Sequence, residues 1–137
     1  MKPRDAPFLT VHCRLLSAVQ ESYGKKTSHI DTNLPHDIPG LADTGAQVCT
    51  AGCDLLATLG INEEHLIPTV MNVKGVTHSP VTVLGAIFLQ VSASGMYTKQ
   101  IVYIVRGARS LILSEKALKD LGVIPKNFPE DFQRFSL

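Results

Sequence analysis

The chain of 137 residues has no excess of either charge, with 13 Lys and Arg side chains against 12 Asp and Glu. Its basic residues also form no long run. A protein whose main task is to bind a phosphate backbone gathers positive charge on one face, and this composition does not supply it. We therefore expect no nucleic acid among its partners.

Long apolar runs are also missing. None approaches the roughly 20 residues that a helix needs to cross a membrane. The N-terminus has Pro3, Asp5 and Pro7 where a secretory signal peptide needs a continuous apolar core. We therefore expect no membrane partner and an intracellular, cytoplasmic location.

Cysteine is scarce and odd in number, with Cys13, Cys49 and Cys53. This count fits free thiols in a reducing compartment better than a disulfide framework. Cys49 and Cys53 have the spacing of half a zinc site, but no second pair or suitably spaced histidine completes four ligands. We expect no metal and no cofactor.

Motifs of several enzyme classes are absent as well. The five histidines form no H-E-x-x-H metal motif, and no G-x-S-x-G nucleophile turn occurs. Gly40 and Gly45 have the spacing of two glycines in a phosphate-binding loop, but Ala46-Gln47 stands where that loop needs Lys and Ser or Thr. Serine hydrolases, metal hydrolases and P-loop proteins therefore find no support.

The informative stretch is Leu41-Ala42-Asp43-Thr44-Gly45-Ala46. Asp43 follows an apolar run, and Gly45 permits a tight turn that larger residues resist. We expect Asp43 to lie in a buried turn, where a carboxylate is costly and therefore indicates a catalytic task. The alternative is an ordinary Asp-x-Gly surface turn, because Asp-Thr-Gly occurs by chance in a chain of this length with a probability of about a few per cent.

The length fits one domain that buries a sizeable core but is too short for two lobes that each carry an active-site loop. Strands are predicted by alternation and β-branched residues at 8–16, 29–32, 47–50, 81–91 and 96–105, with a core segment at 111–113. Residues 101–105 are apolar enough for burial on both faces. Residues 17–28 are polar and predict a loop. The prolines within 33–40 predict an edge strand or irregular structure, because proline cannot donate into a ladder.

Two short helices are predicted, over residues 55–59 with Asp54 as N-cap and over residues 115–121 with Ser114 as N-cap. The glycine that follows each segment ends its helix. A further capped turn is expected at residues 62–64.

A long β-hairpin is predicted where residues 69–73 and 81–91 flank a polar tip at 74–80. The tip contains Gly75, which lets the backbone change its angles while the arms stay paired. We interpret the hairpin as a flap that closes over a site. The alternative is a passive connection.

Three landmarks in order resemble the retropepsins, the aspartic proteases of retroviruses and LTR retrotransposons. These are the apolar Asp43-Thr44-Gly45-Ala46 turn, the glycine-tipped hairpin, and Leu111-Ile112-Leu113 leading into a short helix that ends Leu-Gly. The similarity covers residues 38–128. It is greatest to gypsy-type retrotransposon proteases, which carry similar D-T-G-A-Q turns and Leu-Gly-Val-Ile-Pro endings.

The resemblance implies an all-β fold with one or two short helices. This fold is a closed acid-protease barrel that forms half of a symmetric homodimer. It places a protease domain at residues 38–128, between an N-terminal strand and loop segment at 1–37 and a C-terminal tail at 129–137. The implied activity is an aspartic endopeptidase that processes a retrotransposon polyprotein, in the cytoplasm or within a retrotransposon particle. The alternative is a domesticated dimerisation or peptide-binding module without proteolytic activity.

By the same resemblance, Asp43 and its symmetry mate form the catalytic pair, which needs no metal. Thr44, Gly45 and Ala46 complete the active-site loop, in which the Thr44 hydroxyls hydrogen-bond across the two-fold axis. An extended polypeptide substrate would be bound by Gln47 and the flap residues Val73, Lys74, Gly75 and Val76.

The chain departs from the family at two positions together. Many retropepsins have Gly-Arg where this chain has Ser114-Glu115. Retroviral members often pair that arginine with an acidic residue at the position of Gln47. A hydrogen bond from the Gln47 amide to Glu115 is therefore expected to replace the ion pair.

Overall fold

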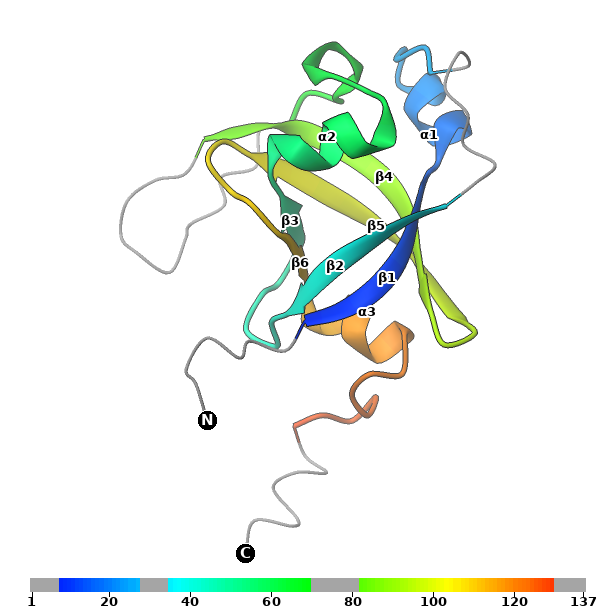
Figure 1. Cartoon of the computed structure of the whole chain (residues 1–137), viewed down its shortest axis with the longest axis vertical. Coiled ribbons are helices and arrows are strands. Elements are labelled where there is room, and N and C mark those ends of the chain that lie inside the picture. Colours follow the sequence, from blue (N-terminus) through cyan, green and yellow to red (C-terminus); the bar gives the residue numbers. More distant parts are fainter. Residues whose placement is uncertain (1–7, 28–34, 70–81, 130–137) are drawn as a thin grey trace, which may run out of the picture.

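The computed structural model describes residues 8–27, 35–69 and 82–129. Six strands of this part close into a barrel in the order β1-β2-β6-β3-β5-β4 (Figure 1). The strands are β1 Phe8–Leu15, β2 His36–Ala42, β3 Cys49–Ala51, β4 Val83–Ala93, β5 Met96–Val105 and β6 Leu111–Leu113. The predicted all-β class and closed barrel are therefore confirmed.

Short helices lie at the two ends of the barrel. They are α1 Ser17–Ser22, α2 Cys53–Leu59, the 3-10 turn η1 Glu63–His65, and α3 Glu115–Asp120. Figure 1 shows α1 and α2 at one end of the barrel and α3 at the other. The described residues thus hold three α-helices, one more than the sequence predicted.

The longest pairing is the antiparallel hairpin of β4 and β5, which runs from Val83 opposite Val105 to Ala93 opposite Met96, with a register shift between Val83 and Gly85. Ser94 and Gly95 connect the two strands, and both have positive φ angles, of 51° and 81°. The connection lies in the gap between the strands predicted at residues 81–91 and 96–105. The predicted strand at residues 29–32 lies outside the described residues.

β2 is an interior strand, so its prediction as an edge was wrong. It pairs antiparallel with β1 on one side and parallel with β6 on the other. Pro39 is tolerated because the pairing with β6 begins only at the next residue, Gly40 opposite Leu111. Among the described strands, Pro39 pairs only with Thr10 of β1, so the proline lies at a local edge of an interior strand.

β1 closes the barrel, because it pairs with β4 as well as with β2. Residues before position 38 therefore contribute to the same barrel as those after it. The barrel interior is filled by alternate residues of the strands, as expected where one face of a sheet is buried. The largest fully buried apolar side chains are Val11, Ile87, Leu89, Val91, Val102, Ile104, Leu113 and Leu118.

The end of β5 is not buried on both faces as predicted. Val102 and Ile104 point into the core and are 0% exposed, whereas Ile101 is 41% exposed and Tyr103 is half-buried. The apolar run at this point therefore reflects β-branched strand residues on a partly open outer face.

Helix α1, Ser17–Ser22, takes the place of the first part of the loop predicted for residues 17–28, whereas residues 23–27 form no helix or strand. Its buried residue Gln20 donates from Nε2 to the carbonyl oxygen of His65 across 2.9 Å. The Oε1 atom of Gln20 accepts the backbone N–H of Phe88 across 2.8 Å. These tertiary bonds stabilise a polar helix that its own sequence pattern does not predict.

The remaining helix ends follow local rules with one exception. Helix α2 begins at Cys53 with Gly52 as its N-cap and no side-chain cap, so the predicted Asp54 cap is wrong. Asp54 instead lies in the first turn, where its negative charge stabilises the helix through the helix dipole. Gly60 ends the helix in the left-handed conformation, and Asn62 caps η1, as predicted.

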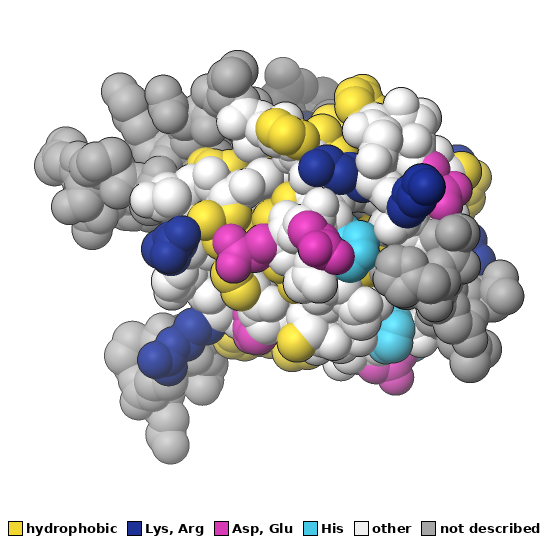
Figure 2. Space-filling model, turned by 90° about the horizontal axis from the view of Figure 1, so that it is seen from above, with side chains coloured by type: hydrophobic (Ala, Val, Ile, Leu, Met, Phe, Trp, Pro, Cys, Tyr) yellow, Lys and Arg dark blue, Asp and Glu magenta, His cyan; other side chains and the backbone are white. Residues whose placement is uncertain are grey.

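No helix in the described ranges is long and apolar enough to cross a membrane. On the face seen in Figure 2, basic, acidic and histidine side chains are interspersed among polar and apolar atoms. Charge of one sign does not gather on that face of the described residues.

Candidate active-site turn

The Asp-Thr-Gly-Ala turn connects β2 to β3 at the end of the barrel that carries α3 (Figure 1). β2 delivers the chain to Asp43, whose backbone N–H donates to the carbonyl oxygen of Leu113 at the end of β6 across 3.2 Å. The parallel pairing of β2 and β6 therefore continues by one hydrogen bond into the turn. The position of Asp43 is set by the barrel rather than by a free loop.

Two hydrogen bonds within the turn fix its shape. The Gly45 N–H donates to Oδ1 of Asp43 across 2.9 Å, and the Ala46 N–H donates to the carbonyl oxygen of Asp43 across 3.0 Å. The first bond is a local bond between an aspartate side chain and the backbone, of the kind that stabilises Asx turns. It holds one carboxylate oxygen against the backbone and defines the orientation of the other.

The turn lies at the surface of the single chain. Asp43 and Ala46 are half-buried, and Thr44, Gly45 and Gln47 are exposed. The expectation of a buried turn is therefore wrong for one chain by itself. The apolar residues before Asp43 end at the surface, so the Asp43 carboxylate keeps contact with solvent and loses little hydration there.

The reason predicted for Gly45 also needs correction. Its φ angle is not among the positive ones, so the backbone does not require glycine there. A Cβ atom at this position would meet only Oδ1 of Asp43, at 3.4 Å, which is an ordinary contact. The single chain therefore leaves room for a side chain at residue 45.

The expected pairing of Gln47 with Glu115 is absent from the described residues. The Glu115 carboxylate instead contacts Nζ of Lys119, one helical turn later, across 3.3 Å. The backbone N–H of Glu115 reaches the turn, since it donates to the carbonyl oxygen of Ala46 across 3.2 Å. The main chain, not the two side chains, thus connects this helix to the turn.

The structure brings five of the predicted site residues together in one turn, from Asp43 to Gln47. The predicted flap residues Val73, Lys74, Gly75 and Val76 lie outside the described residues. Their contribution to substrate binding stays a prediction.

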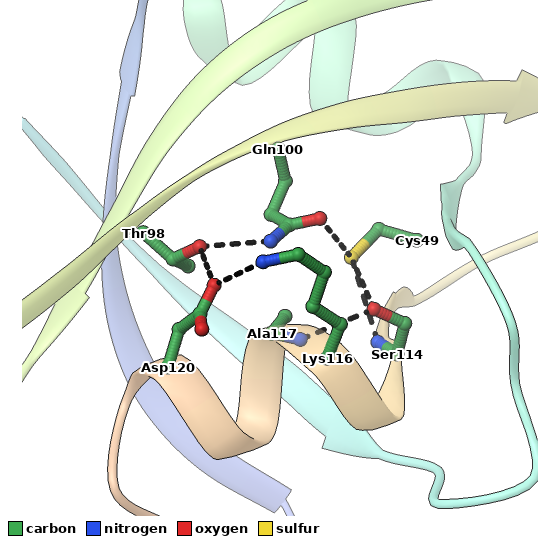
Figure 3. Close-up of polar contacts among 7 residues, drawn as sticks. All are labelled: Cys49, Thr98, Gln100, Ser114, Lys116, Ala117 and Asp120. Carbon is green, nitrogen blue, oxygen red and sulfur yellow. Dashed lines mark hydrogen bonds and ion pairs between the residues drawn. The ribbon is translucent and has the colours of Figure 1, made fainter.

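Sequence reasoning missed a polar network behind the turn (Figure 3). Cys49 in β3 has its Sγ atom 3.5 Å from Oγ of Ser114 and 3.9 Å from Oε1 of Gln100. The amide of Gln100 donates to Oγ1 of Thr98 across 2.8 Å, and Thr98 donates to Oδ2 of Asp120 across 2.8 Å. β3, β5 and α3 are therefore connected through polar side chains inside the barrel end.

Two titratable groups in or near this network have pKa values that differ from their ordinary values. Hydrogen bonds from Lys116 and then Thr98 hold the pKa of Asp120 below its usual value of 3.8. Burial, with a smaller effect of the neighbouring Cys49, raises the pKa of the Cys13 thiol to about 12. Cys13 is therefore a protonated, inert core residue at neutral pH.

A pocket of about 150 Å³ lies between β2, α2 and the segment before β6. Its lining residues are Asp37, Ile38, Pro39, Asp54, Leu55, Thr58, Arg109, Ser110 and Leu111. None of the turn residues borders it, so this pocket is separate from the candidate active-site turn.

No protein-family model and no curated protein matches the sequence. Among solved structures, the chain is similar to the EIAV protease complexed with the inhibitor HBY-793, at 16% identity and a TM-score of 0.53. That match covers 89% of this chain and 93% of the other. It is also similar to the retroviral protease-like domain of Ddi1 from Leishmania major, at 19% identity and a TM-score of 0.50, over 84% of this chain and 78% of the other. The barrel is therefore a retropepsin-like fold.

Proposed function

We propose that the chain is an aspartic endopeptidase whose active site forms when two copies bring their Asp43 turns together. The observation that carries this proposal is the Asp43 carboxylate itself. It lies in an exposed turn and is oriented by the Gly45 N–H across 2.9 Å. The barrel fixes the start of the turn through the hydrogen bond from the Asp43 N–H to the carbonyl oxygen of Leu113 in β6. A preorganised carboxylate at an open surface suits a reaction that needs a second carboxylate opposite it.

The homodimer follows from a count of catalytic groups. The chain contains a single Asp-Thr-Gly, whereas the mechanism needs two carboxylates. Thr44 and Gly45 are exposed, and Gly45 leaves room for a side chain that the sequence does not supply. A second turn approaching across a two-fold axis would occupy this open space and would account for the glycine.

The chemistry follows from placing two carboxylates close together. Both cannot be ionised at once at small separation, so one stays protonated while the other acts as a general base. The ionised Asp43 takes a proton from a water molecule that attacks the peptide carbonyl carbon. The protonated partner donates a hydrogen bond to the developing oxyanion and then supplies the proton that the leaving amine takes up.

We propose an extended polypeptide as substrate, bound in the intracellular compartment in which the chain is made. The D-T-G-A-Q turn and the Leu-Gly-Val-Ile-Pro ending favour the polyprotein of a gypsy-type retrotransposon, or a host gene derived from one. Support for a peptide-binding cleft also comes from the fold, since the EIAV protease with the same fold is complexed with an inhibitor.

The decisive experiment compares Asp43→Asn with Asp54→Asn in cleavage of a library of extended peptides. Asp43→Asn keeps the size of the side chain and one acceptor oxygen but removes the titrating group, so we expect cleavage to be lost. Asp54 is an exposed aspartate in the first turn of α2, and its variant should keep parental activity. Cleavage by Asp43→Asn at the parental rate would refute the proposal. If the parent protein dimerises and binds peptides without cleaving them, the alternative is supported, namely a dimerisation or peptide-binding module without proteolytic activity.

A further inference from the structure

Three consecutive residues at the junction of β6 and α3 use their backbones to contact the Asp43 turn and the start of β3. The carbonyl oxygen of Leu113 accepts the Asp43 N–H at 3.2 Å, and the Glu115 N–H donates to the carbonyl oxygen of Ala46 at 3.2 Å. Between them, the Ser114 N–H donates to Sγ of Cys49 across 3.4 Å. The segment from 113 to 115 therefore holds the turn at Asp43 and at Ala46, and it holds Cys49 at the start of β3, two residues after the turn.

The middle contact differs from the other two because its acceptor is a side chain. Cys49 is 1% exposed and Ser114 is 2% exposed, so water cannot replace this hydrogen bond. The Ser114 N–H is thus a buried donor whose partner is the sulfur. Loss of the sulfur would leave the donor unsatisfied, which is far more costly in a core than at a surface.

The same serine also begins helix α3. Its Oγ atom accepts the Ala117 N–H across 3.3 Å as the N-cap, and lies 3.5 Å from the Cys49 sulfur. One side chain therefore joins the start of the helix to the first residue of β3, the strand that leaves the turn. Figure 3 shows Ser114 at the first turn of α3, with Cys49 beside it.

The other end of α3 is held through the same network. Gln100 lies 3.9 Å from the Cys49 sulfur and donates to Thr98, and Thr98 donates to Asp120 in the last turn of the helix. Helix α3 is therefore attached to β5 at its C-terminal end and to β3 at its N-terminal end. A helix fixed at both ends is a rigid support for a turn that rests on its first residues.

We propose that Cys49 is a positioning residue, whose buried thiol clamps the start of β3, directly after the Asp43 turn, to the N-terminal end of α3 and so fixes the turn. The proposal rests on the function proposed above only for its effect on catalysis, because the clamp itself is a property of the resting chain. Cys49 contacts no substrate atom in this proposal and acts through the Asp43 backbone. Cleavage should respond in the rate of the chemical step rather than in substrate binding.

The first arm of the test measures the clamp without any activity. Amide hydrogen exchange is followed at Asp43, Ser114 and Glu115 in Cys49→Ala, with the Ile104 amide of β5 as the reference for global opening. We expect exchange at the three clamp amides to increase at least about tenfold more than at Ile104. Cys49→Ser, which keeps an acceptor atom, should restore most of the protection. An increase no larger than at Ile104 would overturn the proposal.

Cys13→Ala is the matched control for this arm. Cys13 is equally buried in the same core, and within the described part of the chain its thiol forms no hydrogen bond with the turn. Its removal should destabilise the whole barrel through a small cavity, so that the clamp amides and Ile104 change together. Selective loss of protection at the clamp amides in Cys13→Ala would show that any core cavity loosens the turn, and would contradict a specific role of Cys49.

The second arm measures peptide cleavage by the same variants. We expect Cys49→Ala to lower kcat about tenfold while KM stays within about twofold of the parent, and Cys49→Ser to recover most of kcat. An unchanged kcat in a variant whose clamp amides exchange faster would overturn the positioning role. If the parent itself cleaves no peptide, the endopeptidase is refuted, and the exchange arm alone still decides whether the clamp exists.

Discussion

The hydroxyl of Thr98 in β5 donates to Oδ2 of Asp120 in the last turn of α3 across 2.8 Å. Nζ of Lys116 donates to the same oxygen across 3.0 Å, from one helical turn earlier. Two donors on one carboxylate oxygen favour its ionised form, which accounts for the lowered pKa of Asp120. The attachment of α3 to the barrel is therefore an interaction that acid weakens.

This relationship predicts a stability contribution that is lost in acid. Because the pKa of Asp120 is lowered from 3.8 in the folded chain, its contribution is fully present above 3.8 and disappears as the pH falls through the folded value. Thr98→Val should reduce the free energy of unfolding by about 1 kcal/mol near neutral pH, since the carboxylate is partly exposed. The difference from the parent should shrink at a second, strongly acidic pH below the folded pKa of Asp120, where the carboxylate is protonated in both states.

Urea unfolding of the parent and Thr98→Val at the two pH values measures this effect. Thr58→Val is a suitable control, because the exposed Thr58 hydroxyl donates to the backbone carbonyl oxygen of Asp54 in α2 and not to a carboxylate. A difference between parent and Thr98→Val that stays the same at both pH values would show that the carboxylate does not take part.

A second prediction concerns protein concentration. If two Asp43 turns form one active site, specific activity should fall on dilution as the dimer dissociates, and saturating peptide should oppose the fall. Sedimentation and cleavage are measured over the same concentration series. The midpoints of the two curves should coincide within the error of each method. Constant activity per chain at concentrations where sedimentation finds only monomer would place the site within a single chain.

The third prediction is a bell-shaped dependence of kcat/KM on pH, with its optimum on the acidic side of neutral. Cleavage requires one proton shared by the two Asp43 carboxylates, so the rate falls when both are ionised and again when both are protonated. Asp120→Asn should keep the shape of this profile, because Asp120 supports α3 and is not part of the pair. A rate that rises steadily into alkali would indicate a different general base.

Local signals in the sequence were sufficient for much of the fold. The Ser114 cap, the turn at Ser94-Gly95 and the end of α2 at Gly60 each depend on the conformational preference of one or two residues. The strands follow from alternation of buried and exposed positions. Elements whose energy is local can be predicted from a local pattern.

The errors occur where distant contacts decide the structure. Helix α1 depends on Gln20, whose partners are His65 and Phe88, and no local pattern indicates that a polar segment will be fixed by a buried amide. The same holds for Cys49, whose contacts Gln100 and Ser114 are 51 and 65 positions away. Both groups matter because a buried polar atom must find a partner. Only the assembled barrel shows which partner it finds.

The candidate site shows the same division. Asp43 stands out in the sequence because an acidic residue follows an apolar run, and the structure places it in an oriented turn. The backbone hydrogen bonds from the turn to Leu113 and Glu115 could not be predicted, since main-chain contacts leave little trace in side-chain identity. The expected side-chain pair of Gln47 and Glu115 was wrong for this reason.

Gly52 and Gly45 are glycines with different roles: the fold requires the first, and the proposed reaction requires the second. A Cβ atom at Gly52, the N-cap of α2, would lie 1.8 Å from the carbonyl oxygen of Ala108, a contact that only a backbone shift can relieve. Gly52→Ala should therefore destabilise the barrel by about 3 kcal/mol or more. Its loss of activity should follow the loss of folded protein.

Gly45→Ala should do the opposite. A methyl group at residue 45 meets only Oδ1 of Asp43 at 3.4 Å, and the backbone φ there does not require glycine, so the free energy of unfolding should change by less than about 0.5 kcal/mol. The methyl group would, however, occupy the space beside the carboxylate that the proposed second turn and the substrate backbone must enter. We expect kcat/KM to fall by at least about a hundredfold in a fully folded protein. Urea unfolding and peptide cleavage of the same preparation test both parts. Parental activity in Gly45→Ala would show that nothing approaches Asp43 from that side, and would contradict the two-fold active site.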